Sequence, residues 1–249
     1  MIRISRKKYN ILKIEDILFA ENYDYDSNAA DIIVFLQCAQ NKKASKLFHT
    51  LHIDLTKDCD SLLQELNKDN RYKINRAQNK DNLTVYFTPS PSLLEIEKYC
   101  KFYDVFASNK KVSPCNQKKL IALNECKSLA LSQISNEEGD ILCEHCYVVD
   151  NKRTRCLYSA SHFRLSEDNS YKSLVGRANR YLHWTDICKF KEQGLAIYDF
   201  GGLSLIEDNE TLKNIDRFKL SFGGKIVTEY NFYKPITLLG RIAAKYLDK

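Results

Sequence analysis

One acid and two adjacent glycines are the first residues in this sequence whose types and spacing could do chemistry. Asp199 ends the apolar run 195–198, and Gly201 and Gly202 follow it almost directly. The chain has only 8 glycines in 249 residues, and glycine permits positive φ and a close approach of the backbone to another group. An acid at the end of a strand is also well placed to accept a proton. We therefore expect Asp199 to be catalytic and Gly201 and Gly202 to bind substrate, with a plain turn as the alternative.

A second candidate lies in the run DILCEHCYVV, which contains Cys143, His145 and Cys146. One CxxC motif lacks the second ligand pair of a typical zinc site. The run alternates like a strand, which sends Cys143 and Cys146 to opposite faces. The sequence therefore predicts a strand without a metal site. His145 could take a proton from an acceptor, although a packed, hydrogen-bonded histidine is the alternative.

Basic residues are concentrated in the segment NRYKINRAQNK, which has helical spacing. Arg76 and Lys80 stand four residues apart and would present two cations together, an arrangement that suits phosphate. We expect Arg71, Arg76 and Lys80 to bind an anion such as a tRNA, a nucleotide-sugar or a lipid pyrophosphate. An ordinary solvated helix face is the alternative.

Composition sets the broader limits. Hydrophobic residues make up 44% and charged residues 28% of the chain, as in globular proteins. The net charge of +6 suits an anionic partner without requiring one. The N-terminus lacks the apolar core of a secretory signal, and no run of eighteen apolar residues is present, so we expect a cytoplasmic protein without a transmembrane segment. The odd count of 9 cysteines then favours free thiols.

The elements that must position these residues follow from periodicity, capping and turn signals. Strands are expected at 31–38, 48–55, 82–88, 128–135, 141–149, 154–161, 195–199 and 225–233. Helices are expected at about 60–80, 92–107, 113–126, 173–193, 209–221 and 236–247. Short links between the three strands from 128 to 161 favour hairpins. The order predicts an α/β fold with a mixed sheet flanked by helices.

This order and three sequence blocks resemble a known family. Residues 176–202 are similar to the helix–strand block of the Fem-type aminoacyltransferases and their FemAB-like relatives, within the GNAT acyltransferase superfamily. NRYKINRA resembles the family's helix with the pattern N-x-R-Y-x-I-R-x-A, and FKLSFGGKIVTEYNFY resembles its closing segment. The resemblance implies a GNAT-like, mostly antiparallel sheet flanked by helices. It covers most of the chain from about residue 50 onward. We therefore expect a GNAT-like domain over residues 46–249 and an N-terminal extension over 1–45 that packs on the core.

The resemblance also implies a function. Fem-type enzymes transfer amino acids from aminoacyl-tRNA to the amine of a peptidoglycan precursor, and shorter relatives accompany capsule, O-antigen or exopolysaccharide synthesis. We therefore expect an aminoacyl or N-acyl transferase acting on a cell-envelope glycan or peptidoglycan precursor. An acetyl-CoA-dependent N-acetyltransferase acting on an amino sugar, and a non-catalytic RNA- or glycan-binding relative, are the alternatives.

In such a fold the acyl donor enters where the strands at 154–161 and 195–199 separate, with Asp199, Gly201 and Gly202 at the mouth. A main-chain N–H there would support the developing oxyanion. Glu229, Asn231 and Tyr233 alternate along the last strand and so share one face. The full set of expected substrate-binding residues is Gly201, Gly202, Asn179, Arg177, Tyr198, Ser159, Glu229, Asn231 and Tyr233.

The donor is suggested by a departure from the family pattern. GNAT proteins that bind acetyl-CoA carry a glycine-containing loop whose amides hold the pyrophosphate. The corresponding segment here, SYKSLVGRANR, keeps only Gly176 and Ala178 and has Ser173 in place of Gln or Arg. This favours aminoacyl-tRNA or another activated acyl donor, with acyl-CoA as the alternative. We expect no tightly bound cofactor. The expected partners are a glycan or lipid-linked acceptor and tRNA, with a transient inner-membrane surface contact left open.

Overall fold

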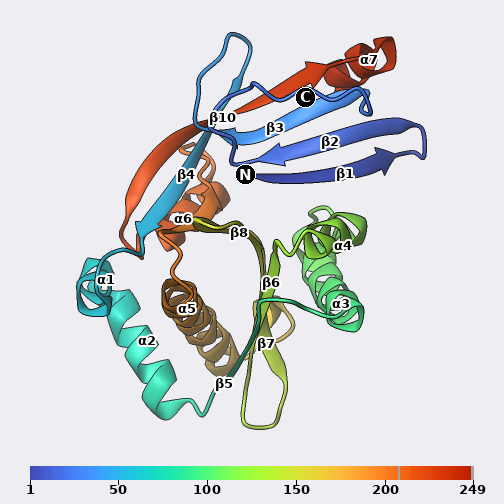
Figure 1. Ribbon diagram of the computed structural model, residues 1–249. Helices are drawn as coiled ribbons and strands as arrows, with labels where there is room; N and C mark the ends of the chain where they lie inside the picture. Colours follow the sequence, from blue (N-terminus) through green and yellow to red (C-terminus); the bar gives the residue numbers. More distant parts are fainter. Residues whose placement is uncertain (207, 248–249) are drawn as a thin grey trace. The chain divides into compact units, whose positions relative to one another are not determined.

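The computed structural model describes residues 1–206 and 208–247, and Figure 1 shows its ribbon. The chain divides into two compact units. Unit 1 contains Met1–Thr50 and Ile226–Lys249, and unit 2 contains Leu51–Lys225. The sequence suggested one boundary after residue 45, whereas the structure groups the N-terminal segment with the C-terminal one. The division falls inside β4, Lys46–Asp54.

Unit 1 is built on a small sheet. Its strands are β1 (Ile2–Lys8), β2 (Leu12–Leu18), β3 (Ile32–Cys38) and most of β10 (Lys225–Pro235), and its helix is α7 (Leu238–Leu247). The strand order is β1-β2-β3-β10, with only β2 and β3 parallel. One core cluster forms around Tyr23 and Phe35, whose rings lie 5.0 Å apart.

The sequence missed β1 and β2, and buried charge explains why. The acids Glu15 and Asp16 interrupt the apolar alternation of β2. Both are buried, and the neighbouring strand supplies their partners. Arg6 binds Asp16 through two hydrogen bonds of 2.7 and 3.0 Å, and Arg3 lies 2.9 Å from Glu15. A pattern based on hydrophobicity cannot anticipate such pairs.

Unit 2 carries most of the helices. Its elements are α1 (Cys59–Glu65), α2 (Lys68–Lys80), β5 (Thr84–Thr88), α3 (Leu93–Lys110), α4 (Gln117–Glu125), β6 (Leu129–Ser135), β7 (Ile141–Val149), β8 (Arg153–Ser161), the 3₁₀ turn His162–Arg164, α5 (Asn169–Glu192), β9 (Ile197–Gly202) and α6 (Glu210–Leu220). Its strand order is β9-β8-β7-β6-β5. Only β8 and β9 are parallel, so the predicted α/β, mostly antiparallel fold is confirmed.

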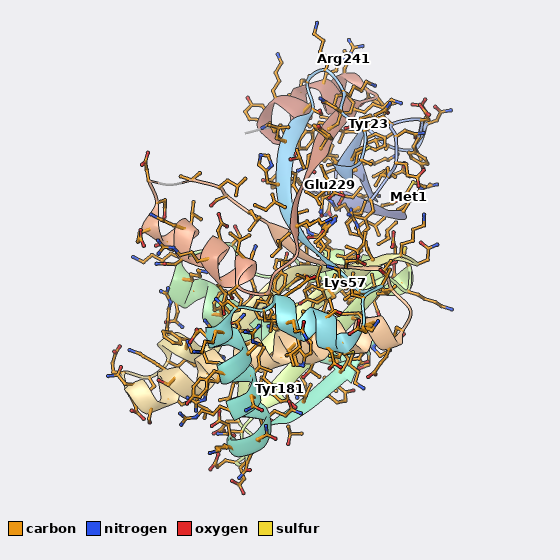
Figure 2. All side chains as sticks on the ribbon, turned by 90° about the vertical axis from the view of Figure 1, so that its left-hand side faces the viewer. Met1, Tyr23, Lys57, Tyr181, Glu229 and Arg241 are labelled. Atoms are coloured by element: carbon orange, nitrogen blue, oxygen red, sulfur yellow. The ribbon has the colours of Figure 1, made fainter. Side chains whose placement is uncertain are left out.

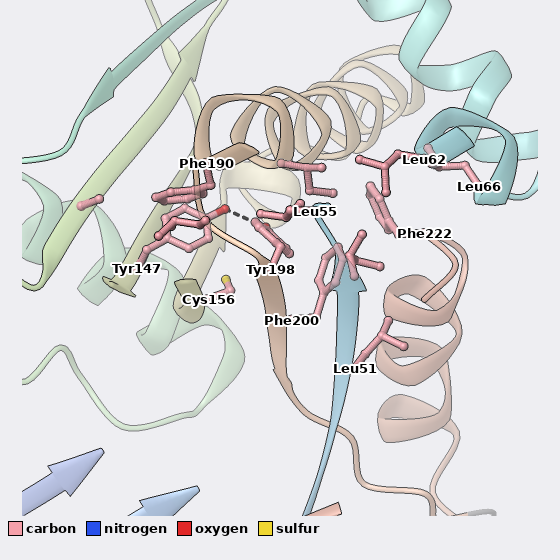
Figure 3. Packing of buried hydrophobic residues seen from close by; sticks show 14 of the residues in the cluster. Leu51, Leu55, Leu62, Leu66, Tyr147, Cys156, Phe190, Tyr198, Phe200 and Phe222 are labelled. Atoms are coloured by element: carbon pink, nitrogen blue, oxygen red, sulfur yellow. Dashed lines mark hydrogen bonds between the residues drawn. The ribbon is translucent and has the colours of Figure 1, made fainter. Parts of the chain in front are cut away.

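Helices cover both faces of the unit 2 sheet, with α5 on one side of β6 and β7 and α3 and α4 on the other (Figure 1). The predicted alternation of β7 is confirmed, because Cys143 contacts the Val175 carbonyl on α5 while Cys146 points toward the α3 side. A cluster of aromatic and aliphatic side chains, centred on Tyr147, Tyr198, Phe200 and Phe222, fills the interior (Figure 3).

Local capping explains where several helix boundaries differ from the expected ones. The helix expected over 60–80 is two helices, because Leu66 is extended and Asn67 caps α2. The helix expected from Ser113 begins at Gln117, where Asn116 accepts a hydrogen bond from Lys119 N, so Pro114 stays outside. A capping box of Ser92 and Glu95 opens α3, in agreement with the helix start expected at residue 92.

The buried carboxyl group of Glu144, on β7, should make the stability of unit 2 depend on pH. Burial raises its pKa to about 7, and its Oε2 has no hydrogen-bond partner among the described residues. Between pH 4.5 and 7 the unfolded chain loses this proton while the folded chain keeps it, so stability falls as pH rises through that window. We expect Glu144→Gln to stabilise the protein by up to about 3 kcal/mol at pH 8 and by much less at pH 5.

Urea denaturation of both proteins at the two pH values measures this difference. Glu137→Gln, an exposed change in the neighbouring turn, is the control. An equal stability change at pH 5 and pH 8 would contradict the assignment of the effect to the Glu144 carboxyl.

Candidate active site

The two parallel strands of unit 2 separate after a short pairing. β8 and β9 pair only at Arg153–Ile197, Thr154–Tyr198 and Arg155–Asp199. Gly201 lies just beyond this point with φ +74°, and a Cβ atom there would lie 3.0 Å from the Cys156 carbonyl oxygen. The glycine therefore lets β9 turn while its backbone stays close to β8. The two strands expected to separate do so, and the backbone of β8 is the group that approaches Gly201.

A pocket of about 630 Å³ opens where the strands separate. It lies wholly within unit 2, and β8, β9, α3, α5 and α6 contribute to its wall. The lining residues are Phe106, Lys110, Cys156, Leu157, Ser159, Ser161, Phe163, Arg164, Val175, Gly176, Asn179, Arg180, His183, Phe200, Thr211, Asn214, Ile215, Phe218 and Lys219. Among the described residues, this lining includes four cations and no Asp or Glu. The wall therefore suits an anionic ligand with an apolar or aromatic part.

A buried hydrogen-bond chain leads from the core of unit 2 to this pocket. Asp186 Oδ2 lies 2.8 Å from Ser132 Oγ, 2.6 Å from the Tyr147 hydroxyl and 2.9 Å from His145 Nδ1. The Tyr147 and Tyr198 hydroxyls are 2.9 Å apart, as the dashed line in Figure 3 shows.

The last link of the chain reaches a pocket-lining residue. His183 Nδ1 lies 2.8 Å from the Tyr198 hydroxyl, and the His183 ring stacks on His145 at 4.0 Å. His183 itself lines the pocket. The chain thus connects a buried carboxylate to a histidine at the pocket wall.

The Asp186 carboxylate only accepts hydrogen bonds, and this fixes the direction of donation along the chain. Burial raises the pKa of Tyr147 and of Tyr198 well above the ordinary value, so both hydroxyls keep their protons. Tyr147 donates its single proton to Asp186, and must therefore accept from Tyr198. Tyr198 has then no proton left for His183, so His183 Nδ1–H donates to Tyr198.

This arrangement leaves the lone pair of His183 on Nε2. Among the described residues, Nε2 has no hydrogen-bond partner. Burial lowers the pKa of His183 well below its ordinary value, with further lowering from His145, Lys219 and Arg180. A neutral imidazole held in one tautomer at the wall of a pocket can act as a general base.

Lys219 supplies a cation to the same wall. It lies on α6, and its ammonium donates a hydrogen bond of 2.6 Å to the Gly202 carbonyl oxygen. Burial lowers its pKa. Two ammonium hydrogens remain beyond that bond, and they can stabilise negative charge that develops on a bound carbonyl oxygen.

Asp199, the acid expected to be catalytic, is buried in the turn itself. Its Oδ1 accepts a hydrogen bond of 2.7 Å from Gly201 N, and its Oδ2 lies 3.6 Å from His52 Nε2. It is not among the residues that line the pocket. Positive φ occurs at Gly201 and not at Gly202, which instead offers its carbonyl to Lys219.

Other expected residues of unit 2 are divided between the pocket and the core. Ser159 and Asn179 line the pocket. Tyr198 is buried in the hydrogen-bond chain, and so is His145, whose Nε2 lies 2.9 Å from Asn179 Oδ1. Arg177 instead binds Asp81 through two hydrogen bonds of 2.6 and 3.0 Å and so ties α5 to the end of α2.

The expected residues of the last strand lie in unit 1. Gln37 joins two of them, since its Nε2 donates to Glu229 at 2.7 Å and its backbone N–H donates to Asn231 Oδ1 at 2.9 Å. Tyr233 pairs with Val34 in the sheet and packs on the cluster beneath α7. Their part in binding substrate stays a prediction.

The expected anion-binding residues have unequal surroundings. Arg71 donates to the Gln64 and Leu66 carbonyl oxygens, at 2.8 and 2.7 Å, and so caps the end of α1. Arg76 is 4.0 Å from Asp81, and Lys80 is exposed at the end of α2. An anion site at Arg76 and Lys80 stays a prediction, whereas the Arg71 guanidinium is already engaged.

Sequence reasoning missed His183, Asp186 and Lys219 as site residues. A signal for the first two was present, because Asn179, His183 and Asp186 recur at helical spacing along α5 and form one polar stripe. The stripe becomes informative only when that face of α5 is known to be buried. Lys219 is the second residue of the block FKLSFGGKIVTEYNFY that resembles the family's closing segment, but that resemblance gave it no role in the site.

Alanine substitutions at Gly201 and Gly202 test whether the two glycines have different roles in the turn of β9. We expect Gly201→Ala to destabilise the protein by about 1–2 kcal/mol, because the added Cβ meets positive φ and the Cys156 carbonyl together. Gly202→Ala, without positive φ, is the control and should change stability by less. Thermal unfolding measures both, and equal losses would remove the special role of Gly201.

Comparison with solved structures defines the class of fold. No protein-family model matches the sequence, and no curated protein does. The structure is similar to that of FemX, with a TM-score of 0.69, 13% identity, and coverage of 99% of this chain and 86% of FemX. The fold is therefore GNAT-like, and the resemblance to FemAB-like proteins expected from the sequence is confirmed at the level of the fold.

Two further structures share this fold. The C-terminal domain of an Agrobacterium fabrum protein described as a lysylphosphatidylglycerol synthetase has a TM-score of 0.56 and 15% identity, with 88% of this chain and 72% of that chain covered. L-PGS from Bacillus licheniformis has a TM-score of 0.55 and 12% identity, with 88% and 73% covered. Identities this low show the fold alone. Among the described residues, no helix is both long and apolar enough to cross a bilayer.

Proposed function

We propose that this chain is an aminoacyl transferase of the Fem type, which acylates an amine of a cell-envelope glycan or peptidoglycan precursor. The observation that carries the proposal is the pocket at the separation of β8 and β9, where a neutral histidine and a buried lysine share a wall to which the described residues contribute no acid. The acceptor class rests on the resemblance of three sequence blocks to Fem-type enzymes. FemX-like topology supports the same class of reaction.

The charge of the pocket favours a donor that carries phosphate. Lys110 and Arg164 have no carboxylate within ion-pair distance among the described residues. Phe106 and Phe163 lie beside them in the wall and offer rings for a base to stack on. The 3′ end of a charged tRNA combines an aminoacyl ester with phosphates and bases, and it matches this mixture.

The start of α5 argues against acyl-CoA. A CoA pyrophosphate in this fold class requires free amides at a helix N-terminus. Here Asp168 caps α5, and its carboxylate accepts a hydrogen bond of 2.9 Å from Ser170 N. Hydrogen bonds from the Ser170 hydroxyl and then from its backbone N–H lower the pKa of Asp168, so the carboxylate stays charged. Gly176 and Ala178, the remnant of the expected loop, lie inside the helix.

The residues of the pocket suffice for the transfer step. The acceptor amine attacks the ester carbonyl carbon, a C–N bond forms, and the ester C–O bond breaks. His183 Nε2 takes the proton from the attacking nitrogen and returns it to the departing ribose hydroxyl oxygen. Lys219 stabilises the negative carbonyl oxygen between these events.

A donor screen tests the proposal. The protein is incubated with a lipid-linked or nucleotide-linked amino-sugar precursor and, in separate reactions, with a pool of charged tRNAs or a panel of acyl-CoAs. Mass spectrometry of the acceptor should show a new aminoacyl amide only with charged tRNA. Acylation from an acyl-CoA alone would replace the proposal with an N-acyltransferase, and no product with any donor would reject a transferase acting on these acceptors.

The salt dependence of RNA binding tests the cationic wall. Each phosphate contact on a single strand contributes about 0.7 to the slope of log K against log salt. We expect Lys110→Gln with Arg164→Gln to reduce this slope by roughly 1.4. Lys118→Gln with Lys127→Gln, two exposed cations outside the pocket, is the control of equal charge. An unchanged slope in the pocket variant would place the RNA elsewhere.

A further inference from the structure

Helix α7 of unit 1 is packed with its small residues inward. Gly240 is buried and Ala243 and Ala244 are half-buried against the cluster of Leu12, Ile14, Ile32 and Val34. A helix on a folded domain ordinarily turns its large apolar residues to the core. In α7 the large apolar residues are on the opposite side.

The outward face of α7 is an apolar stripe with a cationic margin. Leu238, Ile242 and Tyr246 stand at i, i+4 and i+8, and they are 75%, 59% and 75% exposed. Leu239 extends the same stripe. Arg241 and Lys245 are also exposed and form a second row, four residues apart, along one edge. Arg241 is labelled in Figure 2. Residues 238–246 include no acid.

This orientation is locked by the backbone beneath the helix. A Cβ at Gly240 would overlap the carbonyl oxygen of Asp31. Asp31 also accepts a hydrogen bond of 2.8 Å from Thr237 Oγ1, and Gly240 N donates to that same hydroxyl oxygen at 3.1 Å. The helix cannot rotate to bury its large residues without breaking this packing. Exposure of the stripe is therefore a property of the folded unit.

The turn between β1 and β2 adds a second projecting apolar element to the same end of unit 1. Tyr9 and Ile11 are 83% and 70% exposed. Leu12, the next residue, belongs to the core cluster on which Ala243 and Ala244 pack, and α7 contacts β2, so the turn and the helix lie at the same end of unit 1. The flanking Lys7, Lys8 and Lys13 are cations, and Lys8 lies 5.4 Å from the Tyr9 ring.

We propose that this end of unit 1, formed by the outward face of α7 and the β1–β2 turn, docks on an anionic lipid surface. Large apolar side chains bordered by Lys and Arg are the pattern of helices that lie in the membrane interface. Tyrosine, present on both elements, favours the headgroup region. The cationic margin is complementary to anionic headgroups, and the apolar residues project from a helix and a turn instead of lining a groove. This proposal does not rest on the transferase function.

Vesicle sedimentation of the full chain tests the surface. Two vesicle compositions are used: phosphatidylcholine alone, and phosphatidylcholine with 30% phosphatidylglycerol (about a third anionic, enough for a negative surface potential).

We expect the chain to bind the anionic vesicles, and we expect this binding to weaken as the salt concentration rises. Arg241→Gln with Lys245→Gln should lower the partition coefficient by about fivefold per cation. Leu238→Ser with Ile242→Ser should lower it at least tenfold. Leu93→Ser with Leu94→Ser, two exposed leucines on α3, should leave it unchanged.

Three results would overturn the proposal. The first is a chain that stays in the supernatant with anionic vesicles. The second is equal binding by the control and the α7 leucine variant. The third is self-association that the α7 variant abolishes while vesicle binding is untouched, since this would make a second copy of the chain the occupant. Circular dichroism of each variant confirms that the changes, all at exposed positions, leave the fold intact.

Discussion

Replacing His183 by asparagine should lower the rate of acyl transfer by about 10²–10⁴-fold, the usual contribution of a positioned general base. Asparagine can keep the hydrogen bond from the Nδ1 position to Tyr198, and it lacks the basic Nε2. The fold should survive, because the Phe200, Phe218 and Phe222 rings that surround the imidazole stay in place. Single-turnover transfer with saturating donor measures the effect.

Two comparisons make this result specific. Tyr198→Phe removes the acceptor of the Nδ1–H bond and should reduce the rate less, since the base itself remains. Asp199→Asn tests the acid favoured by the sequence. If Asp199→Asn abolishes transfer while His183→Asn keeps it, the base is at the turn and not on α5.

The pH profile gives an independent check on the same residue. Because burial holds the pKa of His183 well below its ordinary value, the base stays unprotonated at pH 6.5. The kcat/KM of the wild type should therefore not fall as pH is lowered through 6.5, and its acid limb should lie at lower pH. If kcat/KM instead falls to half of its maximum at the ordinary pKa of histidine, the general base is an exposed group and not the buried His183.

Gly240→Ala should destabilise unit 1 by about 2–3 kcal/mol, within the usual range for overpacking. Helix propensity alone predicts the opposite sign, a gain of about 1 kcal/mol. The expected reversal comes from the overlap of the new Cβ with the Asp31 carbonyl, a backbone group that cannot move aside easily. Hydrogen exchange of β2 and β3 amides during a urea series measures the stability of this unit.

Gly176→Ala is the matched control, because Gly176 also lies within a helix and its Cβ would meet only the Arg180 side chain at 3.8 Å. This change should stabilise unit 2 by roughly 0.5–1 kcal/mol. The single tryptophan, Trp184 on α5, reports unit 2 by fluorescence. A gain of stability in both variants would mean that the backbone of α7 at Gly240 is not in close contact with Asp31, the residue before β3.

The sequence predicted the scaffold of unit 2 well because its signals are local. The alternation of β7, the capping box at Ser92 and the glycine after α5 depend on neighbouring residues alone. The separation of β8 and β9 followed from family resemblance. Unit 1 was harder, because β2 buries Glu15 and Asp16 and needs partners from β1.

The candidate site was only partly predictable, since its chemistry depends on which side of each element is buried. Asp199 looked catalytic from its place at the end of a strand, yet its carboxylate binds Gly201 N within the same turn. His183 looked like one member of a polar helix face. Its value as a base appears only through Tyr198 and Tyr147, residues on two different strands. The spacing along α5 relates His183 to Asp186, but nothing in the spacing relates either residue to Tyr198 or Tyr147.

Unit 1 is assembled from an N-terminal and a C-terminal segment of the chain, and this determines when it can fold during synthesis. β3 is buried on nearly all positions and pairs with β10, which the ribosome makes only after the whole of unit 2. At about 5–20 residues per second, β3 waits roughly 10–40 s for this partner. During that interval its hydrophobic edge is open to another nascent chain. We expect slower translation of unit 2, or a stalled chain, to increase aggregation through Ile32–Cys38.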